Sequence, residues 1–394
     1  MSAFLTDPSL LDHGHGPSSR HFAESPKERN VQHVLVIGAG IIGLLTAYKL
    51  VGAGLRVTLV EGGEPGREAS WAGGGIVSPL YPWRYPAAVQ ALALQAQDAY
   101  PALTAQLLQD SGVDPELHVT GLYWMDVEDE EQALAWAARF ERTLERVPVD
   151  DVRRTIPALA DRFQRALYMP GVANIRNPRL LKALRVALER LAHAEIHSQQ
   201  PVQGFVQEGG RVVGVRTAAR EYRADQVVLA AGAWSGELLA TLGVQLPVQP
   251  VRGQMILFKC ATDFLPSMVL AGRRYAIPRR DGHILVGSTL EYCGFDKSTT
   301  ENALDSLRAT AAELLPDLAN APVVGHWAGL RPGSPDGIPF IGELASHPGL
   351  WLNCGHFRNG LVLAPASCRL LADLILGRAP SIDPAPYAPD QRLG

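Results

Sequence analysis

The pattern of apolar and polar residues predicts the first regular elements from residue 31 onward. Residues 33–37 (HVLVI) form a continuous apolar run, which is typical of a parallel strand covered on both faces. A glycine-rich turn follows at residues 38–43, and apolar side chains then recur at helical spacing over residues 41–48. Residues 56–60 (RVTLV) are the next predicted strand, which ends on Glu61. The sequence therefore predicts a strand, turn, helix and strand unit of about 30 residues.

The rest of the chain carries further helix and strand signals. Five more helices are predicted, at residues 87–109 with a break near Pro101, at 128–146, from Pro178 onward with Asn177 as its cap, at 302–315 and at 359–376. Residues 202–206 and 212–216 flank a turn (Glu208, Gly209, Gly210) and are predicted to form a hairpin. Further strand signals lie at residues 226–230, 249–290 and 350–352.

Composition and charge narrow the classes of partner. The 394 residues are 47% hydrophobic and 19% charged with a formal net charge of −4, which allows a buried core and argues against nucleic acid as a partner. The four cysteines show neither CxxC spacing nor the density of a disulfide scaffold, so we expect free thiols and no metal site. No secretory signal and no apolar run of about 18 residues is evident, so we expect a cytoplasmic protein that does not bind membranes.

The turn at residues 38–43 carries the strongest chemical signal. Gly38, Gly40 and Gly43 form a GxGxxG pattern that follows a predicted strand and opens a predicted helix. The first glycine permits a tight turn, the second lets the backbone approach a pyrophosphate, and the third allows the helix to pack on the strand. The helix N-terminus offers N–H groups and partial positive charge to phosphates. Glu61 would accept ribose hydroxyls and repel a 2′-phosphate, so the pattern favours NAD or FAD over NADP.

The order of these elements predicts an α/β plus α+β protein. We expect a Rossmann-like dinucleotide-binding domain interleaved with a smaller substrate domain that is built on a mostly antiparallel sheet. The predicted segments are 31–85, 157–246 and 325–378 for the first domain and 86–156 and 247–324 for the second. Residues 1–30 are polar and without period, which predicts a disordered leader, and residues 379–394 are predicted to be a C-terminal tail.

Two more segments carry candidate binding residues. Residues 67–75 end in three glycines, whose N–H groups could close on an extended dinucleotide, although an ordinary flexible loop has the same composition. Arg331 lies between Leu330 and Pro332 at an apolar strand end, where an unpaired guanidinium is costly. Its expected partner is an anion, which is either a substrate carboxylate or the side chain of Asp336.

Together these segments resemble the glycine oxidase and D-amino acid oxidase family of flavoproteins across about residues 31–376. The markers are residues 38–43 with Glu61, residues 70–75, 231–235 (AGAWS), 250–254 (PVRGQ), 328–333 (AGLRPG) and 355–360 (GHFRNG). The resemblance implies non-covalent FAD, because residues 325–337 lack the cysteine that similar covalent flavoproteins carry. The FAD contacts that it implies are Gly38, Gly40, Ile41, Ile42, Gly43, Glu61, Gly62, Glu68, Ala69, Gly73, Gly74, Gly75, Val202, His356, Phe357, Arg358, Asn359, Gly360, Leu361 and Val362.

The resemblance also implies a small amino acid substrate and dioxygen as partners. Arg331 is implied to hold the substrate carboxylate, with Tyr275 and Arg358 nearby. A carboxylate that enters a dry pocket has to be neutralised, and arginine does this with two parallel hydrogen bonds. On sequence alone, Arg358 is equally well explained as a solvated side chain and Tyr275 as a packing residue. No catalytic acid or base is expected, provided that the substrate amine is neutral.

The implied reaction is the oxidative deamination of glycine and other small amines, among them sarcosine and small D-amino acids. Its products are a 2-oxo acid, ammonia and hydrogen peroxide, and it supplies an imine for the thiazole of thiamine in many bacteria. We expect a homo-oligomer. Two alternatives stay open. The first is a D-amino acid or D-proline dehydrogenase that uses another electron acceptor. The second is a flavin domain that modifies tRNA, and the net charge argues against this second alternative. Leu290 and Trp71 depart from the family pattern, so the preferred substrate stays open.

Overall fold

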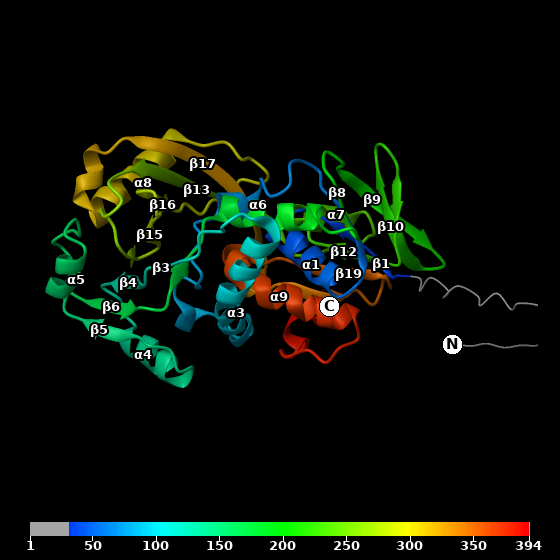
Figure 1. Cartoon of the computed structure of the whole chain (residues 1–394), viewed down its shortest axis with the longest axis horizontal. Coiled ribbons are helices and arrows are strands. Elements are labelled where there is room, and N and C mark those ends of the chain that lie inside the picture. Colours follow the sequence, from blue (N-terminus) through cyan, green and yellow to red (C-terminus); the bar gives the residue numbers. More distant parts are fainter. Residues whose placement is uncertain (1–30, 394) are drawn as a thin grey trace, which may run out of the picture. The chain divides into compact units, whose positions relative to one another are not determined.

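The computed structural model describes residues 31–393, and the predicted leader at residues 1–30 lies outside the described residues. A six-stranded, mostly parallel sheet carries the first strands of the chain (Figure 1). Its strands, in spatial order, are β18 Phe340–Glu343, β19 Leu350–Cys354, β12 Gln226–Leu229, β1 His33–Ile37, β2 Arg56–Val60 and β8 Ala194–His197. Only β18 runs antiparallel to its neighbour. The predicted strands at residues 33–37, 56–60, 226–230 and 350–352 are confirmed.

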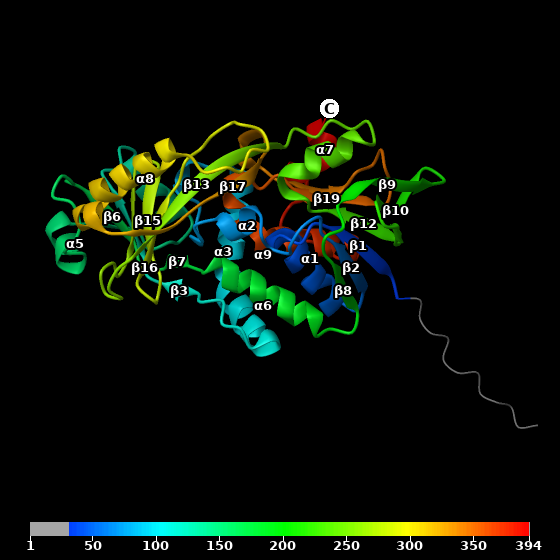
Figure 2. The same cartoon turned by 90° about the horizontal axis from the view of Figure 1, so that it is seen from above.

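Both faces of this sheet are covered, as the continuous apolar runs indicated. Val34 and Val36 of β1 point into one core, and Leu35 and Ile37 point into the other. Helices cover the first face (Figure 2), and they are α1 Ile41–Gly52, α3 Ala87–Ser111, α6 Asn177–Glu189 and α9 Gly360–Ile375. A small sheet and a short helix cover the second face, and they are β9 Val202–Glu208, β10 Arg211–Thr217, β11 Glu221–Arg223 and α7 Ser235–Ala240. The predicted hairpin at residues 202–216 is confirmed.

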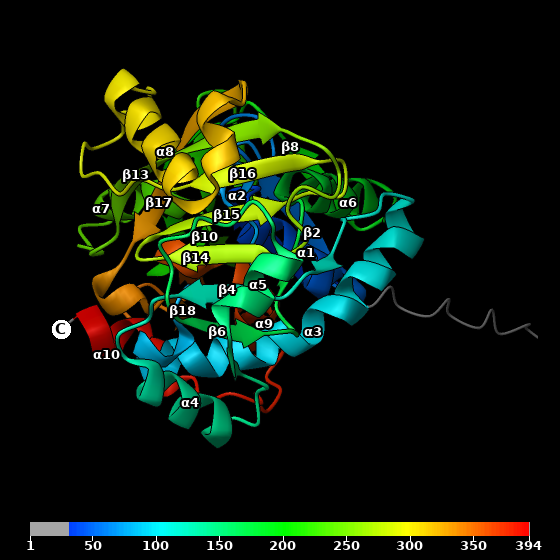
Figure 3. The same cartoon turned by 90° about the vertical axis from the view of Figure 1, so that its left-hand side faces the viewer.

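A second sheet has eight strands and is mostly antiparallel, as predicted (Figure 3). Its spatial order is β17 Val323–Gly333, β13 Gln249–Lys259, β16 His283–Gly287, β15 Arg274–Pro278, β14 Met268–Ala271, β4 Leu122–Met125, β6 Ala166–Met169 and β5 Glu145–Val147. The only parallel pair among these strands is β14 with β4. One face packs against α5 Val149–Thr155 and α8 Glu301–Leu314, and the other packs against α4 Glu130–Arg139.

Short elements complete the described part of the chain. They are α2 Ala69–Ala72, α10 Pro389–Leu393, β3 His118–Val119, β7 Ala173–Asn174 and six 3-10 turns, namely η1 Pro82–Arg84, η2 Gly232–Trp234, η3 Pro316–Asn320, η4 Pro335–Gly337, η5 Phe357–Asn359 and η6 Ala385–Tyr387. No helix in residues 31–393 is long and apolar enough to cross a membrane. The four cysteines form no disulfide.

Three details of the predicted helices are wrong. The helix predicted over residues 128–146 ends at Arg139, because residues 145–147 pair with β6 as an edge strand. The break predicted at Pro101 is absent, since α3 continues to Ser111 and buried side chains on both sides of the proline hold it in place. Asn177 is the first residue of α6 and not its cap, because its amide donates to the carbonyl oxygen of Ser70 at 2.7 Å. In each case a tertiary contact outweighs the local signal.

The two-domain division stays a prediction. If the two large sheets are taken as the domain cores, residues 166–169 and 323–333 belong with the second sheet. The prediction gave most of these residues to the nucleotide-binding domain. Likewise α3, predicted in the substrate domain, packs in the core of the first sheet.

Candidate functional site

A cavity of about 700 Å³ extends from the first sheet to the second. The first sheet contributes the turn after β1, the end of β2 and the segment after β19, whereas the second contributes Tyr275 of β15 and Arg331 of β17. Such a volume accommodates a ligand of cofactor size. All the predicted site residues line this cavity except Gly43. The structure therefore brings together residues that are up to about 320 positions apart in the sequence, as expected for ligands at the carboxyl ends of parallel strands.

The glycine turn has the geometry that its sequence indicated. Gly38 has a φ of +98°, and a Cβ there would lie 2.6 Å from the carbonyl oxygen of Ala230 on the neighbouring strand. A Cβ at Gly43 would lie 1.8 Å from the carbonyl oxygen of Gly38, which explains why this glycine packs the helix on the strand and does not line the cavity. The start of α1 faces the cavity. The N–H of Ile41 donates to the hydroxyl of Ser70 at 3.0 Å, so the helix dipole and the N–H of Ile42 are what the turn offers to phosphates.

Glu61 is held at the edge of the cavity by two backbone groups. Its Oε2 accepts a hydrogen bond from the N–H of Ala39 at 2.7 Å, and its Oε1 accepts one from the N–H of Gly63 at 2.8 Å. Each carboxylate oxygen has a second acceptor position. The side chain can therefore take both hydroxyls of a ribose while its orientation stays fixed, and its charge disfavours a 2′-phosphate.

The second glycine segment lies where side chains would collide with its surroundings. A Cβ at Gly75, whose φ is +80°, would lie 2.1 Å from the carbonyl oxygen of Ile175, and one at Gly74 would lie 3.2 Å from the hydroxyl of Tyr275. The cavity is also lined by Asn177 and Asn359, whose buried Oδ1 and Nδ2 atoms have no hydrogen-bond partner among the described residues. An unpaired buried polar atom is costly, so a ligand with donors and acceptors fits this lining. A dinucleotide such as FAD supplies both.

The opposite end of the cavity carries positive charge without an acidic partner. Arg331 donates from Nη1 to the carbonyl oxygen of Thr289 at 3.1 Å and from Nη2 to the hydroxyl of Ser288 at 2.8 Å. In residues 31–393 neither Arg331 nor Arg358 forms an ion pair, and the alternative pairing of Arg331 with Asp336 is wrong. Burial lowers the pKa of Arg331, and the charge of Arg358 lowers it further. This end of the cavity is therefore suited to an anion.

Gly253 limits how Arg331 lies, and Tyr275 lines the same end of the cavity. Gly253 is on β13, next to β17, and a Cβ there would lie 1.9 Å from Nη1 and 2.2 Å from Cζ of Arg331. The guanidinium group thus lies directly across the backbone of β13. The Tyr275 side chain is 6% exposed and lines the same end of the cavity. Tyr275 thus both packs in the core of the second sheet and lines the cavity, so both interpretations made from the sequence stay open.

His356 lines the cavity as a neutral side chain. Its Nε2 lies 2.7 Å from the hydroxyl oxygen of Ser367, and that hydroxyl donates to Oδ1 of Asn353 at 2.6 Å. Because the hydroxyl hydrogen is used by Asn353, Nε2 of His356 has to carry the donated proton. Burial lowers the pKa of His356 to about 3, and it raises the pKa of the neighbouring Cys354 thiol to about 12. Neither side chain therefore changes its charge near neutral pH.

Sequence reasoning missed several residues that shape the site. Arg279 is buried and donates to the carbonyl oxygens of Gly74 and Ile175, both at 2.8 Å, so it fixes the second glycine segment to the second sheet. Lys297 forms an ion pair with Glu68 at 2.8 Å and also spans the two parts of the cavity. Ser70 accepts a hydrogen bond from the N–H of Ile41 at 3.0 Å. Arg279 and Lys297 lie outside the regular elements, where no local signal would have identified them, whereas Ser70 belongs to the marker segment 70–75 and was not singled out in it.

Comparisons with known proteins place this geometry in context. The sequence profile of the family described as DAO, FAD dependent oxidoreductase, matches residues 33–374. A glycine oxidase of Pseudomonas aeruginosa is 65% identical over 92% of this chain and 100% of its own length. A bifunctional protein ThiO/ThiG of Trichormus variabilis is 31% identical over 87% of this chain and 52% of its own. The crystal structure of glycine oxidase from Geobacillus kaustophilus superimposes with a TM-score of 0.86 and 29% identity, covering 92% of this chain and 100% of that one.

Proposed function

The chain belongs to the DAO family of FAD-dependent oxidoreductases, and from that premise we propose that it is a glycine oxidase. The observation that carries the proposal is the cavity itself, which has a dinucleotide-binding turn at one end and Arg331, paired only with neutral groups, at the other. The 65% identity to a glycine oxidase over its whole length supports the same reaction. Glycine is the smallest amino acid, and its carboxylate is the group that Arg331 would recognise.

We propose that the predicted contacts hold the cofactor. Glu61 would accept the ribose hydroxyls, the start of α1 would face the pyrophosphate, and Gly74 would let the backbone approach the bound molecule. When bound, FAD takes up the electrons and hydrogen of the substrate α-carbon and returns the electrons to dioxygen, which yields hydrogen peroxide. The N–H groups at the start of α9, near Asn359, would stabilise negative charge beside them.

The chain's own residues then bind and orient the substrate. Arg331 would form two hydrogen bonds with the carboxylate, and Tyr275 and Arg358 would limit its orientation, so that the α-carbon faces the cofactor. The positive charge of the two arginines disfavours an ammonium group and so favours the neutral amine that can be oxidised. A protein acid or base is not required, which agrees with the neutral, hydrogen-bonded state of His356. Water hydrolyses the resulting imine to glyoxylate and ammonia.

A peroxide-release screen tests the proposed function. We expect air-saturated enzyme to release hydrogen peroxide with glycine, and we propose lower rates with sarcosine and small D-amino acids. In an anaerobic experiment, glycine should bleach the FAD and admitted air should restore its colour within the turnover time. The D-amino acid or D-proline dehydrogenase is the second candidate. Fast bleaching by D-proline with slow recovery in air would favour it over an oxidase.

We also expect the FAD to be released when the protein is precipitated with acid. The cysteine that lines the cavity, Cys354, keeps its thiol protonated, and the His356 ring is bonded to Ser367, so neither is a ready nucleophile for the isoalloxazine ring. Cys293 is exposed in a loop and does not line the cavity. The measurement is the absorbance of supernatant and pellet at the flavin maximum. A pellet that stays yellow after washing would mean a covalent bond.

The biological setting is likewise proposed. The ThiO/ThiG relative supports a role in thiazole synthesis for thiamine, in which the imine or glyoxylate product would be consumed. A homo-oligomer and a cytoplasmic location stay predictions from the sequence. Light scattering of the purified holoenzyme would measure the first.

A further inference from the structure

Arg279 is a buried cation that the proposed reaction does not use. It directly follows β15 and is 8% exposed. Its Nη2 donates to the carbonyl oxygen of Gly74 at 2.8 Å, and its Nη1 donates to the carbonyl oxygen of Ile175 at 2.8 Å and to Oδ1 of Asn174 at 3.0 Å. All three acceptors are neutral. The side chain therefore supports the glycines at residues 73–75, which line the cavity, without an acid of its own.

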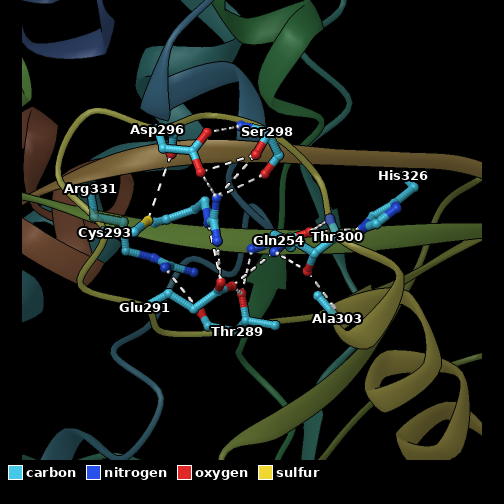
Figure 4. Close-up of polar contacts among 11 residues, drawn as sticks. Gln254, Thr289, Glu291, Cys293, Asp296, Ser298, Thr300, Ala303, His326 and Arg331 are labelled. Atoms are coloured by element: carbon cyan, nitrogen blue, oxygen red, sulfur yellow. Dashed lines mark hydrogen bonds and ion pairs between the residues drawn. The ribbon is translucent and has the colours of Figure 1, made fainter.

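Arg252 of β13 shows how a buried cation is ordinarily compensated. It is 6% exposed and forms ion pairs with Glu291 and Asp296, which belong to the loop between β16 and α8 (Figure 4). Within residues 31–393, Arg279 forms no ion pair. Taking a charge out of water is costly unless an opposite charge or well-placed dipoles compensate it. The charge of Arg279 is therefore left to the peptide dipoles around it.

The two carboxylates that raise the pKa of Arg279, Glu116 and Asp281, are themselves paired with another arginine. They lie 3.3 Å and 2.8 Å from Nη1 of Arg176. Burial, and after it the charge of Arg176, lowers the pKa of Arg279 to about 10. Arg279 therefore keeps its positive charge near neutral pH, although no carboxylate is bonded to it.

The hydrogen bond from Arg279 fixes the orientation of the peptide group between Gly74 and Gly75. A planar trans peptide directs its C=O and its N–H to opposite sides, and the one cis peptide bond among the described residues lies elsewhere. Because the carbonyl oxygen of Gly74 points to Arg279, the N–H of Gly75 points away from it. The carbonyl oxygen of Gly75 accepts from the N–H of Ile175 at 2.8 Å. The N–H of Gly75 has no hydrogen-bond partner in the described part of the chain, so it is a donor for a ligand in the cavity.

This donor lies at the end of the cavity where cofactor and substrate have to meet. A Cβ at Gly74 would lie 3.2 Å from the hydroxyl oxygen of Tyr275, and Tyr275 and Arg331 line that end. The FAD ring has to reach the same end to accept the hydrogen of the α-carbon. The ring becomes more negative when it takes up electrons, so a donor beside it favours the reduced form. A cation bonded to the carbonyl oxygen of a peptide polarises the N–H of that peptide and makes it a stronger donor.

We propose that Arg279 is a positioning residue that acts through the peptide between Gly74 and Gly75, aiming and polarising the N–H of Gly75 so that it stabilises reduced FAD. The inference rests on the proposed placement of the FAD ring beside Tyr275 and Arg331. Arg279 itself does not line the cavity, so its charge reaches the cofactor through this one peptide group.

The test measures the redox equilibrium of the bound cofactor without any substrate. Holoenzyme and a reference dye of known potential are reduced together by dithionite without oxygen, and the absorbance of each gives the ratio of reduced to oxidised FAD. We expect Arg279→Met to shift this ratio about 10-fold towards oxidised FAD, because hydrogen bonds that involve charged groups contribute on this scale. Arg279→Gln keeps a donor for the carbonyl oxygen of Gly74 but loses the charge, so it should shift the ratio in the same direction by less.

A second measurement separates this role from a merely structural one. Because the redox and binding equilibria are linked, Arg279→Met should weaken the binding of reduced FAD about 10-fold more than the binding of oxidised FAD. A residue that only held the glycines in place would weaken the binding of both forms equally and leave the dye equilibrium unchanged. Equal weakening would therefore overturn the inference.

Arg280→Met is the matched control, because it removes the same charge from the next residue. Arg280 is partly exposed, pairs with Asp114 at 3.0 Å and does not line the cavity, so the dye equilibrium should stay at the wild-type value. An equal shift in Arg280→Met would show an effect of net charge and not of the peptide, and the inference would be wrong. If Arg279→Met does not retain FAD, Arg279→Gln carries the test, and a wild-type ratio in that variant would count against the inference in the same way.

Peroxide release with glycine, measured in parallel, separates this inference from the proposed function. If the Arg279 variants shift the equilibrium while the wild-type protein releases no peroxide with glycine, the role of Arg279 stands and the proposed substrate is wrong. Peroxide release by the wild-type protein, together with an unshifted equilibrium in the variants, would mean the reverse.

Discussion

Replacing Arg331 with alanine should lower kcat/KM for glycine by roughly 10²- to 10³-fold while the protein keeps its FAD. Breaking a buried charge pair by removing one partner costs about 3–5 kcal/mol, and here the partner that loses its cation is the substrate carboxylate. The dinucleotide end of the cavity is built from other residues, with Glu61 and the start of α1 at its centre. The variant should therefore be yellow and folded, and nearly inactive.

The measurement is steady-state peroxide release, with FAD content read from the absorbance ratio of the purified protein. Arg331→Lys is the matched control, because it keeps the charge and loses the planar pair of donors, so its activity should lie between those of the other two proteins. Kinetics equal to those of the wild-type protein would show that Arg331 is not the anchor. Loss of FAD from Arg331→Ala would show that the two ends of the cavity do not bind independently.

Replacing Gly253 with alanine should lower kcat/KM by about 10²-fold, although Gly253 touches neither ligand. The new Cβ would lie 1.9 Å from Nη1 of Arg331, where no real contact can exist. The β13 backbone cannot move away easily, because it is buried and paired on both sides with β16 and β17. The guanidinium group is the end of a flexible side chain, so it is the part that moves, and a misplacement of about 1 Å can cost 10²-fold in rate.

Two comparisons isolate this effect. In Gly171→Ala, nothing lies within 4 Å of the new Cβ, so the rate should be unchanged. The Gly253→Ala/Arg331→Ala double variant should be no slower than Arg331→Ala alone, because the methyl group acts only through the arginine. If the two losses add in the double variant, then Gly253 acts through the sheet and not through Arg331. Wild-type activity in Gly253→Ala would show that Arg331 tolerates another position.

These predictions depend on the way in which the two sheets share one cavity. The dinucleotide end comes from β1, β2 and the helix starts, and the anion end comes from β15 and β17. Arg279 and Lys297 join the ends, through the carbonyl oxygen of Gly74 and the carboxylate of Glu68. The separation between cofactor and substrate sites is thus set by contacts between segments about 200 residues apart. That separation decides whether an α-carbon held by Arg331 reaches the cofactor.

Local sequence was sufficient wherever the determining interactions are local. Gly38 is favoured by its positive φ in the turn and Gly43 is required by its contact with the carbonyl oxygen of Gly38, and the buried strand before them shows in its continuous apolar run. The hairpin at residues 202–216 likewise follows from two glycines in its turn. The end of the helix at Arg139 was missed because the strand that follows exists only through its pairing with β6.

The sequence by itself determined the dinucleotide-binding unit, the two types of sheet and the candidate residues at both ends of the site. It left the partner of Arg331 open between Asp336 and a substrate, since five residues of separation permit either. The tertiary structure decided this, because the strand pairing turns Arg331 across Gly253 into the cavity while Asp336 stays at the surface. The tertiary structure also revealed Arg279 and Lys297. Their contacts depend on strand register and loop position, which nearby residues in the sequence do not specify.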